Sequence, residues 1–147
     1  MRNVQSMHRY KGRCQCHAVE VLVELTQPLS SYSARKCDCD FCIQRHISYL
    51  SDPNGKLNIC TNLELDIQKQ GSDQAEFLTC PMCEDVISAS IQIEDNRIGA
   101  LNASLLDECS SLKTATIVSP QKLSAQEKLS RWQTFWTSVS ITALTPP

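Results

Sequence analysis

Apolar and polar residues alternate along several short segments of the chain. In 19-VEVLVEL-25 the odd-numbered positions are all apolar, and two of the three positions between them are glutamates. This period of two is typical of a strand that buries one face, and 63-LELDI-67 repeats it. Further short strands are predicted at 47-ISYL-50, 56-KLNIC-60, 86-VISASIQIE-94 and 98-IGALNASLL-106. The pattern predicts a mainly β protein.

A different period begins after Pro120. Apolar residues then recur three or four positions apart, at Leu129, Trp132, Phe135, Trp136 and Val139. This spacing is typical of one face of an amphipathic helix, and 124-SAQE-127 has the form of a capping box with Ser124 as the N-cap. We predict a C-terminal helix at about residues 124–140. Its aromatic stripe is expected to pack on the core or on a second copy in a homodimer.

Length and charge exclude several classes of protein. The 147 residues are typical of one domain, with a core at about residues 10–118. Fourteen basic and sixteen acidic residues give a net charge of −2, so we expect no nucleic-acid partner. The first residues lack the apolar region of a secretion signal, and glutamates interrupt the longest apolar run, 18-AVEVLVEL-25. We expect a soluble, cytoplasmic protein that does not bind membranes.

Seven of the nine cysteines fall into three short clusters: 14-CQC-16, 37-CDCDFC-42 and 80-CPMC-83. Cysteines at CxC spacing bridge poorly, because a disulfide needs Cα atoms about 4.4–6.8 Å apart and a torsion near 90°. The odd total and the clustering also argue against a secreted disulfide scaffold. Reduced thiolates that bind a metal explain the pattern better.

The spacing of the clusters indicates zinc. Two short cysteine turns from distant parts of a chain typically form a tetrahedral zinc site. Rubredoxin-like iron is compatible with the same spacing, but no common ferredoxin motif matches. Seven thiols divide into four plus three, and the residues alone leave open which clusters pair. A four-cysteine site is closed, whereas three protein ligands leave a position for water or substrate.

The order GxCxC, Val-rich strand, CxCxxC and CxxC resembles the glutathione-dependent formaldehyde-activating enzymes, a family that includes relatives of centromere protein V. The similarity covers about residues 10–110, and the three clusters in this order make it specific. The matching segments are 12-GRCQCHAVEVLVEL-25, 37-CDCDFCIQRHISYL-50, 77-FLTCPMCEDVISAS-90 and 98-IGALNASLLD-107.

The resemblance implies a mainly antiparallel, zinc-containing β-tent fold with two zinc ions. A structural ion is implied at Cys14, Cys16, Cys80 and Cys83, and a catalytic ion at Cys37, Cys39 and Cys42. The implied enzyme is a carbon–sulfur lyase, similar to S-hydroxymethylglutathione synthase, that forms or cleaves an adduct of formaldehyde with glutathione. The implied partners are a small thiol such as glutathione and an aldehyde.

Residues around the second cluster are candidates for the remaining chemistry. Arg45 is a candidate anchor for a substrate carboxylate. Four residues are close enough in sequence to supply the proton for the new hydroxyl: Asp38, Asp40, His46 and Tyr49.

His46 also supports an alternative interpretation, because CxCxxCxxxH contains a full set of four zinc ligands. If the imidazole closes the second site, the protein is a non-catalytic zinc-binding interaction module of the same fold. A redox sensor that releases its metal on oxidation is a third alternative.

Two glycine positions of the family pattern hold other residues in this chain. The family usually has glycine directly after the first CxC and after the CxxC, where this chain has His17 and Glu84. A side chain is strained there if φ is positive, so we expect the two cysteine turns to differ in shape from those of the family. The remaining cysteines, Cys60 and Cys109, are predicted to be small buried hydrophobic residues.

Overall fold

A computed structural model describes residues 7–37, 40–45, 47–69, 75–118 and 123–144, and it describes only the backbone of Cys37, Asp40 and Phe41. The strands are β1 (His8–Arg13), β2 (Val19–Leu25), β3 (Ser33–Cys37), β4 (Tyr49–Leu50), β5 (Lys56–Thr61), β6 (Asp66–Lys69), β7 (Glu76–Thr79), β8 (Val86–Ile93), β9 (Asn96–Asn102), β10 (Lys113–Val118) and β11 (Thr137–Thr142). The helices are α1 (Asp40–Arg45) and α2 (Ala125–Phe135), with short 3-10 turns at η1 (Leu29–Ser31), η2 (Ala103–Leu105) and η3 (Cys109–Ser111). The prediction of a mainly β protein is confirmed.

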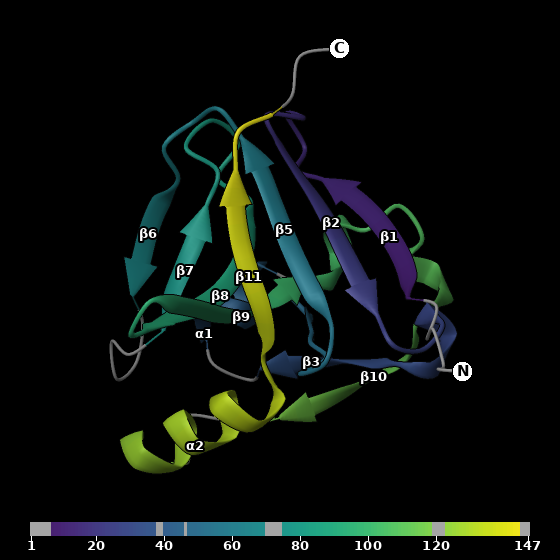
Figure 1. The fold of residues 1–147 in the computed structure, drawn as a ribbon, viewed down its shortest axis with the longest axis vertical. Coiled ribbons are helices and arrows are strands. Elements are labelled where there is room, and N and C mark those ends of the chain that lie inside the picture. The colour runs from purple at the N-terminus through teal and green to yellow at the C-terminus, as the bar shows by residue number, and fades with distance from the viewer. Residues whose placement is uncertain (1–6, 38–39, 46, 70–74, 119–122, 145–147) are drawn as a thin grey trace, which may run out of the picture.

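The strands form one strongly bent, mixed sheet (Figure 1). Its main path runs β1-β2-β5-β11-β9-β4-β3-β10, and β8, β7 and β6 continue from β9. Most neighbours are antiparallel, but β11 pairs with β5 in parallel and β10 pairs with β3 in parallel. The sheet is therefore mainly antiparallel, as expected, and mixed because of these two pairs.

The C-terminal helix is shorter than predicted. The capping box at Ser124 and Glu127 is present, but α2 ends at Phe135 and the chain continues as β11. The segment 137-TSVSIT-142 is rich in β-branched residues, which favour a strand. Val139 fits the helical spacing by coincidence and is instead buried in the sheet. The predicted extension of the helix to about residue 140 is therefore wrong.

Other predicted strands differ in their bounds. β2, β5 and β8 lie where the alternation predicted them. The segment predicted at 98–106 begins earlier, at Asn96, and changes into η2 after Asn102. In the predicted strand 63–67 only the last two residues are extended, as the start of β6.

Buried side chains form two clusters, which we call the main core and the second core. The main core contains Cys14, Val19, Val21, Val23, Leu25, Leu29, Ala34, Leu50, Leu57, Ile59, Leu78, Cys80, Ile87, Leu101, Ala103, Leu105, Leu106 and Val139. The second core contains Cys42, Ile47, Ala75, Phe77, Val86, Ala89 and Ile91, with Tyr49, Leu129 and the stacked pair Trp132 and Trp136 packed against it. These apolar side chains of the α2 region thus pack on the protein itself, the first of the two predicted alternatives. Each core includes cysteines from the predicted metal clusters.

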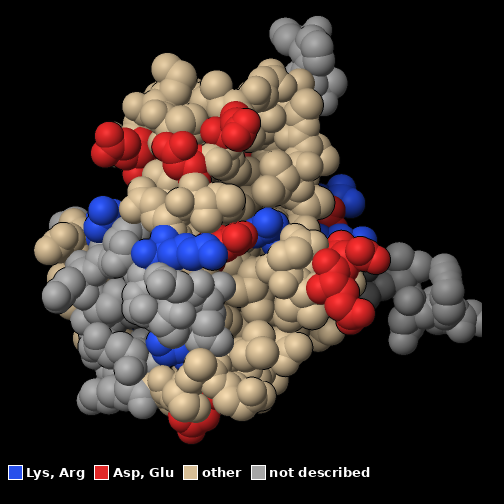
Figure 2. Space-filling model, turned by 90° about the vertical axis from the view of Figure 1, so that its left-hand side faces the viewer, with Lys and Arg blue, Asp and Glu red and all other residues tan. Residues whose placement is uncertain are grey.

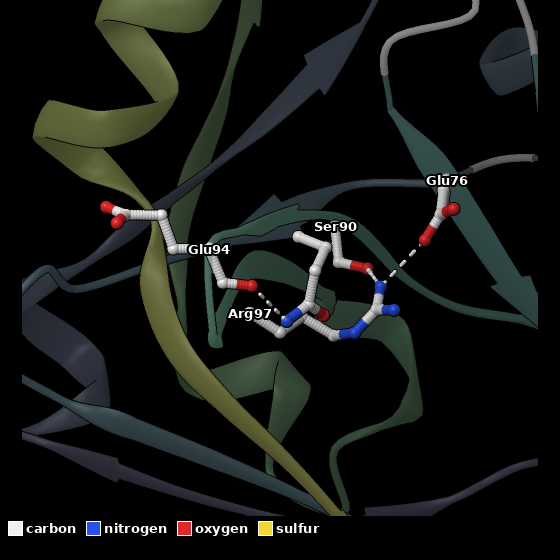
Figure 3. A network of polar contacts seen from close by, with 5 residues as sticks. Glu76, Ser90, Glu94 and Arg97 are labelled. Atoms are coloured by element: carbon white, nitrogen blue, oxygen red, sulfur yellow. Dashed lines mark hydrogen bonds and ion pairs between the residues drawn. The ribbon is translucent and has the colours of Figure 1, made fainter.

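Three neighbouring strands are tied together by one arginine. Arg97 of β9 donates from one guanidinium nitrogen to Glu76 of β7 at 2.9 Å and to Ser90 of β8 at 2.7 Å. Figure 3 shows this bridge across the sheet. Because both charged side chains are about four-fifths buried, the pair resists competition from water more than an exposed ion pair does. The bridge fixes the position of β7, the strand that leads to Cys80.

The distribution of charged side chains on the surface agrees with the modest net charge. On the face shown in Figure 2, basic and acidic side chains are interspersed, and neither sign forms one large patch. Within the described residues, neither helix has the length and apolar character needed to cross a membrane.

Candidate metal centre

Two cysteine-containing turns, which we call the first knuckle (residues 14–17) and the second knuckle (residues 80–84), have closely related backbones. The N–H of Cys14 donates to the carbonyl of Val19, and the N–H of Cys80 donates to the carbonyl of Asp85. The carbonyl of Cys14 accepts from His17, and the carbonyl of Cys80 accepts from Glu84. Each knuckle thus reverses the chain between two strands, β1 and β2 in one case and β7 and β8 in the other.

The residue after each knuckle's last cysteine has a left-handed backbone. φ is 66° at His17 and 67° at Glu84, in the region that side chains rarely adopt. These are the two positions where the resembling family usually has glycine. Both side chains therefore tolerate a strain that glycine would avoid. The expected difference in shape from the turns of the family stays a prediction.

The knuckles bring four sulfurs together. The Sγ atoms of Cys14, Cys16, Cys80 and Cys83 all lie within 4.8 Å of one another. The Cys16 sulfur is 3.6 Å from those of Cys14 and Cys80, too far for a disulfide bond. Tetrahedral zinc with Zn–S bonds of about 2.3 Å requires S···S distances of about 3.8 Å. The group can therefore hold a single metal ion such as zinc.

The backbone around the sulfurs favours thiolates at some positions. A hydrogen bond from the Ala18 backbone lowers the pKa of Cys16. Burial raises the pKa of Cys14 to about 12. Burial also raises the pKa of Cys83, although backbone hydrogen bonds from Asp85 and Cys16 oppose it. A metal must displace protons from the buried sulfurs of this group, which links its affinity to pH.

The residue Gly12, just before the first knuckle, packs closely against residues 105–106. Gly12, two residues before Cys14, pairs with Leu106 in an isolated bridge. A Cβ atom at Gly12 would lie only 2.0 Å from the Leu105 carbonyl oxygen, so no other residue fits there without moving the backbone. The glycine of the GxCxC motif therefore has a steric role.

The structure describes only part of the second cluster. Cys39, Asp38 and His46 lie outside the described residues, and the side chains of Cys37 and Asp40 are not described. The backbone places Cys37 at the end of β3, three residues before α1 begins. The assignment of Cys37, Cys39 and Cys42 as a catalytic zinc site therefore stays a prediction.

Cys42 is the described sulfur of this cluster. Its side chain is 2% exposed in the second core. The Cys42 sulfur lies 3.3 Å from the hydroxyl of Tyr49, close enough for a hydrogen bond with either atom as donor. Tyr49 pairs across the sheet with Arg35 of β3, so this tyrosine joins the two elements that carry the cluster.

Sequence reasoning missed some contacts near the cysteines. Arg35 lies 5.0 Å from the ring centroid of Phe135, which attaches α2 to β3. Burial and the nearby Arg131 lower the pKa of Arg35. Gln15 and Asp85 are joined by two hydrogen bonds between the knuckles. Only their positions beside cysteine ligands could have suggested this pair.

The remaining cysteines differ from prediction. Cys60 is partly exposed and accepts a hydrogen bond from Asn58, and Cys109 is exposed. The expectation that both are buried hydrophobic residues is wrong, since Cys60 ends an alternating strand on its outer face and Cys109 lies in a surface turn.

Comparison with known proteins identifies a related fold. A Rhodobacter sphaeroides protein, whose crystal structure is a structural-genomics target, aligns with a TM-score of 0.51 and 20% sequence identity. The alignment covers 91% of this chain and 99% of that chain. No family model matches the chain, and no curated protein is significantly similar to it. The comparison therefore supports the fold alone.

Proposed function

We propose that the protein is a zinc-dependent carbon–sulfur lyase of the formaldehyde-activating type, with the β-tent fold of that family. The convergence of four sulfurs from two knuckles carries the proposal. The choice of this activity rests on the order of the three cysteine clusters, which resembles the order found in that family. The substrates are a small thiol such as glutathione and an aldehyde such as formaldehyde.

The first site has a structural role in this proposal. Cys14 and Cys80 are buried in the main core, and all four ligands come from protein side chains, which leaves no position for a substrate. A metal there joins the β1–β2 turn to the β7–β8 turn. These turns are more than 60 residues apart in sequence.

The second site, with Cys37, Cys39 and Cys42, has the catalytic role. When bound, a zinc ion with three thiolate ligands supplies Lewis acidity and lowers the pKa of a thiol that enters its fourth position. In the reaction the substrate sulfur bonds to the aldehyde carbon, and the thiol proton ends on the new hydroxyl. The reverse reaction breaks the same carbon–sulfur bond and returns the proton to sulfur.

Residues of the chain orient this site. The Tyr49 hydroxyl contacts the Cys42 sulfur, so it is placed to hold that sulfur in position and to move a proton nearby. Arg45 is the last residue of α1, the short helix that contains Cys42, and it is exposed. An anchor for a substrate carboxylate requires such exposure.

Cobalt substitution tests the open position. We expect titration of the cobalt-loaded protein with glutathione to change the visible spectrum, whereas S-methylglutathione, which lacks a free thiol, leaves it unchanged. Cys42→Ser is the matched control, since it removes a second-site sulfur and keeps the four-cysteine site. If glutathione leaves the visible spectrum of the cobalt-loaded wild-type protein unchanged, the lyase proposal is contradicted.

The burial of Cys42 favours a second candidate, a non-catalytic zinc module of the same fold with His46 closing the second site. A sulfur that is 2% exposed suits a closed site better than one that admits a substrate. His46→Ala separates the two: in the closed module it creates an open position, so glutathione then changes a cobalt spectrum that it left unchanged before.

A further inference from the structure

One residue pair outside the ligand set joins the two knuckles directly. Gln15, between Cys14 and Cys16, donates its backbone N–H to Oδ2 of Asp85 and its side-chain amide to Oδ1, both at 2.9 Å. Two parallel bonds to one carboxylate fix both distance and orientation. The partners are 70 residues apart in sequence, so the contact exists only when both knuckles are in place.

Asp85 also holds its own knuckle through its backbone. Its carbonyl accepts the N–H of Cys80 at 2.9 Å. Through side chain and backbone together, Asp85 contacts the segments that carry all four sulfurs.

We propose that Asp85 and Gln15 form a positioning clamp for the four-cysteine site, which aligns the two knuckles so that their sulfurs converge on one ion. The inference rests on the proposed metal binding at this site. Groups that orient metal ligands typically contribute about 10- to 100-fold in affinity.

The Asp85 carboxylate contributes to metal binding through its hydrogen bonds and not through its charge. Four thiolates around a divalent ion already carry excess negative charge, and a further carboxylate nearby opposes anionic ligands by Coulomb repulsion. Asparagine at position 85 keeps one acceptor and gains donors, and the Gln15 amide can rotate to present its oxygen. Asp85→Asn therefore retains both bonds, while Asp85→Ala loses both.

Competition between each protein and a chromophoric chelator for cobalt or zinc tests the clamp, with the cobalt–thiolate absorption as a second readout. We expect Asp85→Ala to weaken metal binding by about 10- to 100-fold, and Asp85→Asn to stay within about threefold of wild type. Asp95→Ala is the matched control. It removes one exposed carboxylate at the far end of β8, and its affinity should be unchanged.

The competing outcomes are distinct. Wild-type affinity in Asp85→Ala overturns the clamp, as does equal loss in Asp85→Ala and Asp85→Asn. If Asp85→Ala does not fold, Gln15→Ala decides, since it removes one of the two bonds. We expect it to weaken binding by about three- to tenfold, and unchanged affinity overturns the proposal. A wild-type protein that binds no cobalt overturns the metal function and the clamp together, so the two failures are distinguishable.

Discussion

At the scale of single residues, the strained last position of each knuckle shows how much the cysteine turns demand of the backbone. A Cβ atom in the left-handed region costs about 1–2 kcal/mol, yet His17 and Glu84 keep φ near 66°. The hydrogen bonds of the knuckles and the packing around Gly12 outweigh that cost.

Glu84→Gly should therefore stabilise the protein. Glycine removes the left-handed strain but loses about 0.5–1 kcal/mol more backbone entropy on folding, which leaves a net gain of about 0.5–1 kcal/mol. The urea midpoint at a fixed zinc concentration measures it. Glu84→Ala keeps the Cβ atom and should show no gain. An equal shift in both variants would argue against strain at this position.

A buried carboxylate makes stability depend on pH. Burial of Asp52 opposes its charge, but hydrogen bonds from the Thr26 backbone, the Tyr32 and Thr26 hydroxyls and the Asn54 backbone outweigh it and lower the Asp52 pKa. The carboxylate therefore contributes stability above the unfolded-state pKa of about 3.9. This contribution disappears as the pH falls through the lower pKa of the folded state.

Asp52→Asn should lose about 1–3 kcal/mol of unfolding free energy at neutral pH. The difference from wild type should shrink as the pH falls below about 4. Denaturant unfolding at several pH values measures it, with Asp95→Asn as the exposed control. A difference that is constant down to acid pH means that the Asp52 charge does not stabilise the fold.

At the scale of elements, β11 completes the sheet between β5 and β9. Val139 faces the main core, whereas Ile141 on the same strand is 45% exposed. Substitutions at these two positions of one strand therefore separate the effect of core packing from that of strand propensity.

Val139→Ala should cost about 1–2 kcal/mol, because it removes two buried methyl groups and leaves a cavity. Ile141→Ala, a larger truncation near the exposed end of the strand, should cost less. Thermal or urea unfolding of the two variants measures the difference. The reverse order would place β11 outside the stable core.

Local patterns predicted some elements and missed others. β2 and β5 alternate cleanly because one face is buried, so their sequence carries the signal. β1 exposes half of its side chains and β10 exposes most of its own, and neither edge strand has an apolar period to detect. β11 was assigned to the helix because Val139 continues the spacing of the Trp132–Trp136 stripe.

The sequence predicts the cysteine clusters, their pairing and the contacts around them to different degrees. The cysteine clusters are local in sequence, so their spacing indicated metal ligation directly. The spacing alone leaves open that Cys14 and Cys16 pair with Cys80 and Cys83, because the pairing depends on β1 and β7 ending near each other; only the family resemblance implied it. The contact of Gln15 with Asp85 has no local signal beyond the positions of the two residues near cysteine ligands.

At the scale of the whole molecule, the two cysteine sites should contribute unequally to stability. Cys80 belongs to the four-sulfur group and is buried in the main core, and structural zinc supplies apparent energies of about 10–16 kcal/mol in small modules. Cys80→Ser should therefore unfold the protein or lower its melting temperature sharply. Cys37→Ser should preserve the fold if its site is catalytic. Comparable losses in both variants, measured by thermal unfolding at equal zinc, contradict this division.

The position of β11 also has a consequence for biosynthesis. Ribosomes make the chain from its N-terminus, so β5 and β9 emerge long before the strand that separates them. Until residues 137–142 arrive, both neighbours present unpaired backbone edges, which are templates for association with other chains. The nascent protein therefore passes through a stage that benefits from chaperone protection, and this stage ends only when β11 is released.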